Sequence, residues 1–124
     1  FQATSDHEIL VVVPALVLRK AVEGQLHSRG YRVVTLKSPL PAFETVVRGR
    51  PDMIIASAMM EAVSGIDLAR AFSAMGSTSK IPFVLLTSFD RGHAELRSLP
   101  EDIRILRHDQ DLDGEITELM QQLS

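Results

Sequence analysis

Residues 51–60 read PDMIIASAMM, and this stretch does most to determine the fold. After Asp52 the run to Ala58 is almost wholly apolar, and it contains no charged side chain. A short continuous apolar run is typical of a strand that is covered on both faces. We therefore predict that residues 52–58 form a central strand of a parallel sheet.

Similar short apolar runs lie on both sides of this stretch, and segments with helical periodicity alternate with them. The runs predict four more strands, at residues 9–13, 31–36, 81–86 and 103–106. Between the first two, Leu18, Val22 and Leu26 recur at i, i+4 and i+8, as on the apolar face of a helix. The last helix is predicted from the spacing of Leu112, Ile116, Leu119, Met120 and Leu123.

Strands and helices that alternate in this way predict an α/β fold. We expect a doubly wound, five-stranded parallel sheet of the flavodoxin-like type, with strand order 2-1-3-4-5 and five helices. The fourth helix is expected to be short, because Gly92 weakens it and Pro100 ends it.

Composition limits the function classes that fit. The chain has 124 residues, which predicts one domain over 1–124, with residues 1–8 as an N-terminal arm. It has no cysteine, and its net charge of -3 argues against direct nucleic-acid binding. No apolar run approaches the ~20 residues that span a membrane, so we expect no membrane contact and a cytoplasmic setting. The missing initiator Met predicts a domain excised from a larger signalling protein.

Three stretches carry a resemblance to a known family. Residues 51–68, 82–90 and 103–107 are similar to the third, fourth and fifth strands, with their loops, of receiver (CheY-like) domains of two-component response regulators. The resemblance extends from about Ile9 to Leu123, and it implies the same fold. In that family the strand ends hold two metal-binding acids, a phospho-accepting aspartate, a threonine or serine, and a lysine.

The positions of that chemistry depart from the family's pattern. The acidic pair falls on Val13 and Pro14, the acceptor position on Ser57, and the lysine position on His108, so that only Thr87 is kept. The resemblance therefore implies a degenerate pseudo-receiver that lacks the acceptor, the acidic pair and the lysine. It also implies no metal site and no cofactor.

Each remaining polar residue has a structural interpretation beside the functional one. Ser57 is expected to fill the space of the lost aspartate, although phosphorylation of its hydroxyl is the alternative. His108 is expected to be a solvated loop residue, with a metal site shared with Asp109, Asp111 and Asp90, or a pH-sensitive role, as alternatives. Thr87 is expected to bond to the backbone, and donation to a bound anion is the alternative.

The leading functional hypothesis is a phosphorylation-independent signalling module that acts by docking to other proteins. Its implied partners are a histidine kinase, a true receiver or an output domain, and a homodimer is left open. The alternative is a receiver-like domain that senses a small ligand, such as a nucleotide or a metabolite. An enzyme is not expected, because no nucleophile–base pair can be recognised. If the family's usual surface is used, the contact face includes Arg91, Leu96, Arg104, Glu115 and Glu118.

Overall fold

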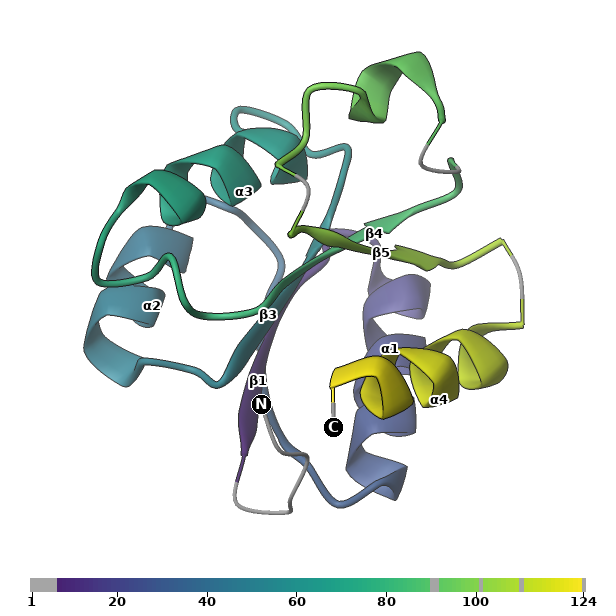
Figure 1. Cartoon of the computed structure of the whole chain (residues 1–124). Coiled ribbons are helices and arrows are strands. Elements are labelled where there is room, and N and C mark those ends of the chain that lie inside the picture. Colours follow the sequence, from purple (N-terminus) through teal and green to yellow (C-terminus); the bar gives the residue numbers. More distant parts are fainter. Residues whose placement is uncertain (1–6, 90–91, 101, 110, 124) are drawn as a thin grey trace.

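The computed structural model describes residues 7–89, 92–100, 102–109 and 111–123. Its core is a five-stranded parallel sheet with the order β2-β1-β3-β4-β5, which confirms the predicted topology (Figure 1). The strands are β1 (Glu8–Val12), β2 (Arg32–Leu36), β3 (Met53–Ser57), β4 (Phe83–Thr87) and β5 (Arg104–Arg107). The strand that contains most of the 51–60 stretch is central, as expected.

Helices cover both faces of the sheet. They are α1 (Leu16–Ser28), α2 (Ala42–Gly49), α3 (Gly65–Ala74) and α4 (Leu112–Leu123). Two of them, α2 and α3, pack on one face, whereas α1 and α4 pack on the other (Figure 1). Among the described helices, none is both long and apolar enough to cross a membrane.

The expected count of five helices is wrong by one. In the described residues of the connection between β4 and β5, the structure has a single 3-10 turn, η1 (Ala94–Leu96), in place of a full helix. Pro100 prevents a longer helix, and the His93 ring caps the turn by accepting a hydrogen bond from the Glu95 N–H at 3.1 Å. Leu96 and Leu99 then bury their side chains against the sheet and hold the turn in place.

The alternation of side chains along the strands produces two separate cores. In and just after β1, Leu10 and Val12 face the α2/α3 side, whereas Ile9, Val11 and Val13 face the α1/α4 side. Every one of these five side chains is buried, which explains why the sequence of this strand is continuously apolar.

Aromatic side chains reinforce each core. Phe72 lies between Phe43 and Phe83, with ring centroids 4.9 and 6.2 Å away. On the other face Tyr31 is buried, and desolvation raises the pKa of its phenol, against a smaller lowering by Arg29. Each fully buried side chain of this size contributes about 1.5–3 kcal/mol to folding.

Three of four local helix signals in the sequence agree with the structure. Ser64 accepts a hydrogen bond from the Asp67 N–H at 3.1 Å as the N-cap of α3. Gly30 follows α1 with φ of 89°, the left-handed geometry in which glycine commonly ends a helix. The apolar stripe of α1 packs as predicted, through Val22 and Leu26. Pro14, a residue type that suits the first turn of a helix, instead lies two residues before α1.

Candidate functional site

The carboxyl ends of the strands meet at one edge of the sheet, and a cavity of about 320 Å³ opens there. Open α/β sheets bind their ligands at this edge, where the strand order reverses. The described residues that line the cavity are Pro14, Ala15, Leu18, Ser57, Ala58, Met59, Leu86, Thr87, Ser88, Phe89 and His108. The structure thus brings together four of the predicted pocket residues, Pro14, Ser57, Thr87 and His108.

The fifth predicted position, Val13, lies outside the cavity. Its side chain is fully buried in the α1/α4 core, and its N–H donates to the Leu36 carbonyl at 3.0 Å. Pro14 follows it and is exposed at the cavity. The resemblance assigns the two residues to one site, but the alternation of β1 continues through Val13 and turns it into the core.

The side chain of Arg19 holds the backbone at the turn after β1. The Arg19 guanidinium donates to the carbonyl oxygens of Val13 at 2.9 Å and Pro14 at 3.1 Å. These bonds fix the turn between β1 and α1 and hold Pro14 against the cavity.

Ser57 ends β3 and is half-buried. It lies opposite Leu86 in the register of β3 with β4, and the next N–H, of Ala58, donates to the Leu86 carbonyl at 2.9 Å. The Gly65 N–H donates to the Ala58 carbonyl at 3.0 Å, so the start of α3 is tied to the end of β3. The position of Ser57 is therefore fixed by backbone hydrogen bonds of its neighbour Ala58 to β4 and to the start of α3.

Thr87 has the structural role that the sequence favours for it. Its side chain is 4% exposed, and its hydroxyl accepts a hydrogen bond from the Phe89 N–H at 3.0 Å. Its carbonyl accepts from the His108 N–H at 3.1 Å, which joins the ends of β4 and β5. The residue thereby shapes the cavity wall through backbone bonds.

His108 is exposed, and the geometry around it does not support a metal site. Of its acidic neighbours, Asp109 is paired with the Arg107 guanidinium, with N–O distances of 2.9 and 2.8 Å. In the described ranges no group of three His, Cys, Asp or Glu side chains could hold a metal ion. Asp90, the more distant candidate, lies outside the described residues.

The cavity does not fit the Mg²⁺ ion that receiver folds commonly hold. Mg²⁺ requires near-octahedral oxygen ligands, usually including one or two carboxylates. None of the described residues that line the cavity is Asp or Glu. Serine and threonine hydroxyls alone would leave the charge of the ion uncompensated.

The loop that follows β3 contains strained backbone. Ala62 has φ of 71°, in the left-handed region that favours glycine. Met59, in the same loop, is 65% exposed, and Met60 is half-buried against the core. The sequence favours core packing for these methionines and leaves open that one of them is exposed at a contact surface; the exposed one is Met59.

Ala62→Gly is expected to stabilise the domain by about 0.5–1 kcal/mol. An alanine in the left-handed region costs about 1–2 kcal/mol, and the extra freedom of glycine in the unfolded chain offsets part of the gain. Urea unfolding measures the difference. Ala21→Gly, on an exposed position inside α1, should instead destabilise by about 1 kcal/mol. Equal losses from both variants would contradict the strain at Ala62.

The expected contact face is only partly exposed. Leu96 is 2% exposed in the core, so it cannot present its side chain to a partner. Arg104 and Glu118 are exposed and both bond to Gln122, at 3.4 Å. Glu115 is half-buried and accepts a hydrogen bond from the Arg107 N–H at 3.0 Å. Arg91 lies outside the described residues.

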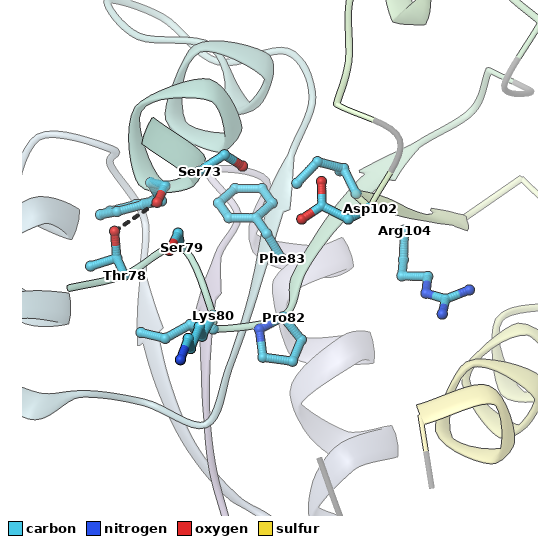
Figure 2. A pocket seen from close by; sticks show the side chains of 11 residues that line it. Ser73, Thr78, Ser79, Lys80, Pro82, Phe83, Asp102 and Arg104 are labelled. Atoms are coloured by element: carbon cyan, nitrogen blue, oxygen red, sulfur yellow. Dashed lines mark hydrogen bonds between the residues drawn. The ribbon is translucent and has the colours of Figure 1, made fainter. Parts of the chain in front are cut away.

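A second cavity, of about 200 Å³, lies at the opposite, amino edge of β4 and β5 (Figure 2). Ser73 and Asp102 point toward the space beside the Phe83 ring, whereas the side chain of Arg104 points away (Figure 2). The Thr78 hydroxyl donates to the Phe72 carbonyl at 2.7 Å and closes the loop after α3. The sequence gives no sign of this cavity, since the loop and strand that form it are far apart in the chain.

The sequence was compared with protein-family models and with curated proteins. No protein-family model matches the chain. The phosphate regulon transcriptional regulatory protein PhoB of Pseudomonas aeruginosa is 30% identical over 80 residues, which are 64% of this chain and 35% of that protein. The response regulator MprA of Mycobacterium leprae is 29% identical over 82 residues, 66% of this chain and 35% of that protein. The chain thus spans little more than a third of the length of these curated relatives.

Solved structures show the same fold. The receiver domain of a signal transduction histidine kinase from Syntrophus aciditrophicus superposes with a TM-score of 0.83 at 22% identity, over 94% of this chain and 89% of that one. Chemotaxis protein CheY4 of Vibrio cholerae gives 0.82 at 19% identity, over 96% and 99%. A receiver domain of a sensor histidine kinase from Pseudomonas aeruginosa, described with a magnesium ion in its active-site cleft, gives 0.81 at 22%, over 94% and 96%. The CheY-like fold that the sequence predicts is therefore confirmed.

Proposed function

We propose that this chain, a receiver (CheY-like) domain by its fold and its curated relatives, is a pseudo-receiver that signals without phosphorylation. One observation carries the proposal: no carboxylate lies among the described residues that line the carboxyl-edge cavity. Val13 is buried elsewhere, and Pro14, Ser57 and His108 occupy strand ends where phosphotransfer would need acids and a lysine.

Ser57 is a poor phosphate acceptor in this setting. A serine hydroxyl needs a neighbouring base to become nucleophilic. Among the described lining residues the one side chain that could serve as a base is His108, which follows β5, two strands away from β3. The serine is better explained as a small residue that fills space at the end of the strand.

The module would act by docking, and apolar exposure at the carboxyl edge supports this. Four large apolar side chains, at the start of α1 and in the loops after β2 and β3, are exposed: Leu16 by 59%, Val17 by 84%, Leu40 by 70% and Met59 by 65%. Exposed apolar clusters on a domain of this size mark interaction surfaces. We place the contact surface here in preference to η1 and β5, with Arg104 and Glu118 as a secondary polar region.

The partners proposed are a histidine kinase, a true receiver, or an output domain of the same or another protein, in the cytoplasm. The curated relatives are regulators of which the matched part is about a third, which supports a setting among further domains. Self-association through the apolar edge is the homodimeric version of the same proposal.

Beryllofluoride, which mimics an acyl phosphate, tests the loss of phosphorylation chemistry. Amide NMR peaks of Ser57, Thr87 and His108 are expected to stay in place when Mg²⁺ and then beryllofluoride are added, because no carboxylate lines the described cavity to bind either. The receiver domain of the Pseudomonas aeruginosa sensor histidine kinase, described with a magnesium ion in its active-site cleft, is the positive control for Mg²⁺. Movement of these peaks together with those of η1 and β5 would show that the cavity still senses an anion and would refute the proposal.

A second candidate function, small-ligand sensing, is favoured by the cavity itself. Its mixture of apolar walls and hydroxyl groups is what small-molecule sites use. The chemistry of those walls determines which class of ligand would fit.

A further inference from the structure

We infer that the carboxyl-edge cavity, lined by Pro14, Ser57, Met59, Thr87, Phe89 and His108, binds a small, planar, uncharged organic molecule with hydrogen-bonding groups at one side. This inference rests on the second candidate function, small-ligand sensing, and names the class of ligand; it does not depend on the docking function. It rests on four features of the cavity: its apolar walls, its free polar groups, its aromatic wall and its lack of charge.

The walls of the cavity are mainly apolar. Seven of the eleven lining residues are apolar, and they come from the loops after β1, β3 and β4, from α1 and from β4 itself: Pro14, Ala15, Leu18, Ala58, Met59, Leu86 and Phe89. Small-molecule sites are typically apolar with a few placed polar groups. The methionine adapts to irregular shapes, and its sulfur makes favourable contacts with aromatic rings.

The polar groups lie at the strand ends. They are the hydroxyls of Ser57, Thr87 and Ser88 and the imidazole of His108. Within the described part of the chain, the side chains of Ser57, Ser88 and His108 have no hydrogen-bond partner, so they are available to a ligand. Together they offer both donors and acceptors, which suits a carbonyl, a hydroxyl or a ring nitrogen.

Phe89 lines the cavity, and its aromatic ring is held in place. It stacks on the His93 ring with centroids 3.8 Å apart and an interplanar angle of 5°. Its backbone N–H is held by the Thr87 hydroxyl. A ring that is held by stacking and at its backbone loses little freedom when a planar molecule packs against it, and this favours aromatic ligands.

The charge of the lining excludes other ligand classes. No Asp, Glu, Lys or Arg is among the described residues of the wall, and His108 is its one titratable side chain. The nearby Arg19 guanidinium is engaged with two carbonyl oxygens. Among the described lining residues, a metal ion, an ammonium group or a doubly charged phosphate would therefore find no charge that compensates its desolvation.

Size limits the ligand further. A volume of about 320 Å³ lies at the low end of small-molecule sites, which run from about 300 to 1,000 Å³. A neighbouring hollow of about 560 Å³ shares Pro14 and Met59 with it and contains Leu40. The cavity proper holds one ring or a fused pair, and a substituent can extend over Met59 into the hollow.

Amide NMR titration with three probes tests the inference: indole as the uncharged planar probe, benzoate as its singly charged counterpart, and inorganic phosphate. Indole is expected to shift the peaks of Ser57, Met59, Thr87, Phe89 and His108 saturably, with a dissociation constant on the order of millimolar for so small a molecule. Benzoate should bind more weakly, and phosphate should move none of these peaks. Failure of indole to saturate them, or stronger binding of phosphate, overturns the inference.

Two matched serine variants test the location. Ser57→Leu fills the carboxyl-edge cavity and is expected to weaken indole binding by at least about tenfold. Ser73→Leu changes a half-buried serine of the amino-edge cavity and should leave binding unchanged (Figure 2). An equal loss in both variants, or in neither, would show that indole binds elsewhere.

A third variant covers the case in which Ser57→Leu does not fold. His108→Ala removes an exposed group of the wall and should weaken indole several-fold while the spectrum remains dispersed. Unchanged binding in that variant counts against the inference. The outcome is separable from the beryllofluoride test, since an organic probe can bind or fail to bind whether or not the cavity responds to the phosphate mimic.

Discussion

Gly65→Ala is expected to destabilise the domain by about 3 kcal/mol or more, the largest effect of any single small substitution at the site. A Cβ at this position would overlap the Ser57 carbonyl oxygen, and it would lie 2.8 Å from the carbonyl carbon and 3.0 Å from Leu85 Cδ1. Because the main obstacle is backbone of the central strand, neither α3 nor β3 can move without disturbing the sheet. The hydrogen bond from the Gly65 N–H to the Ala58 carbonyl would be strained as well.

Thermal and urea unfolding measure this effect. For a domain of this size a loss of about 3 kcal/mol lowers Tm by roughly 10 °C. Gly24→Ala is the matched control, because an added Cβ at that position inside α1 would have no other atom within 4 Å. That substitution should stabilise by about 0.5–1 kcal/mol. Similar changes from the two variants would mean that α3 does not approach β3 as closely as the structure shows.

The strands and their order could be predicted because each strand leaves a local signal. A run that is buried on both faces must be apolar throughout, and the five runs alternate with helical segments in a way that few topologies satisfy. The N-cap at Ser64 and the left-handed Gly30 follow from equally local chemistry. These features needed no knowledge of distant contacts.

Where the structure differs from the sequence predictions, most of the differences come from contacts between distant parts of the chain. Leu96 is predicted on an exposed helix, but with only a 3-10 turn available its side chain reaches the core. Gly65 gives no sign in the sequence of its approach to Ser57, because that contact depends on how α3 packs. The separation of Val13 from Pro14 could have been predicted from the two-residue period of β1, had the alternation been continued by one residue.

The sequence predicted which residues lie together at the candidate site, but not the size of the cavity or the nature of its walls. The resemblance to receivers placed Ser57, Thr87 and His108 at one edge, and the structure brings them to one cavity. The size of that cavity, the stacked Phe89 wall and the exposed Met59 depend on side-chain packing in three loops. Such packing has no counterpart in the spacing of residues along the chain.

Pro14→Asp combined with Ser57→Asp is expected to give the domain a Mg²⁺-dependent stability that the natural sequence is expected to lack. Both positions line the same cavity, so their carboxylates would repel each other across a partly desolvated space. Without metal the double variant should lose about 1–2 kcal/mol at neutral pH. Repulsion raises the pKa of the carboxyl groups in the folded state, so the loss should appear as pH rises and vanish below about pH 4.

Thermal unfolding with and without millimolar Mg²⁺ decides the outcome. A bound ion stabilises the folded state in proportion to the logarithm of its concentration, so Tm of the double variant should rise with Mg²⁺ whereas that of the natural chain should not. The two single variants complete a double-mutant cycle, because each supplies one carboxylate and should respond weakly. If the double variant responds no more than the sum of the singles, positions 14 and 57 do not converge on one ion. If it responds more than that sum, the geometry of a receiver cleft is intact, and the replacement of the carboxylates is what separates this domain from a metal-binding receiver.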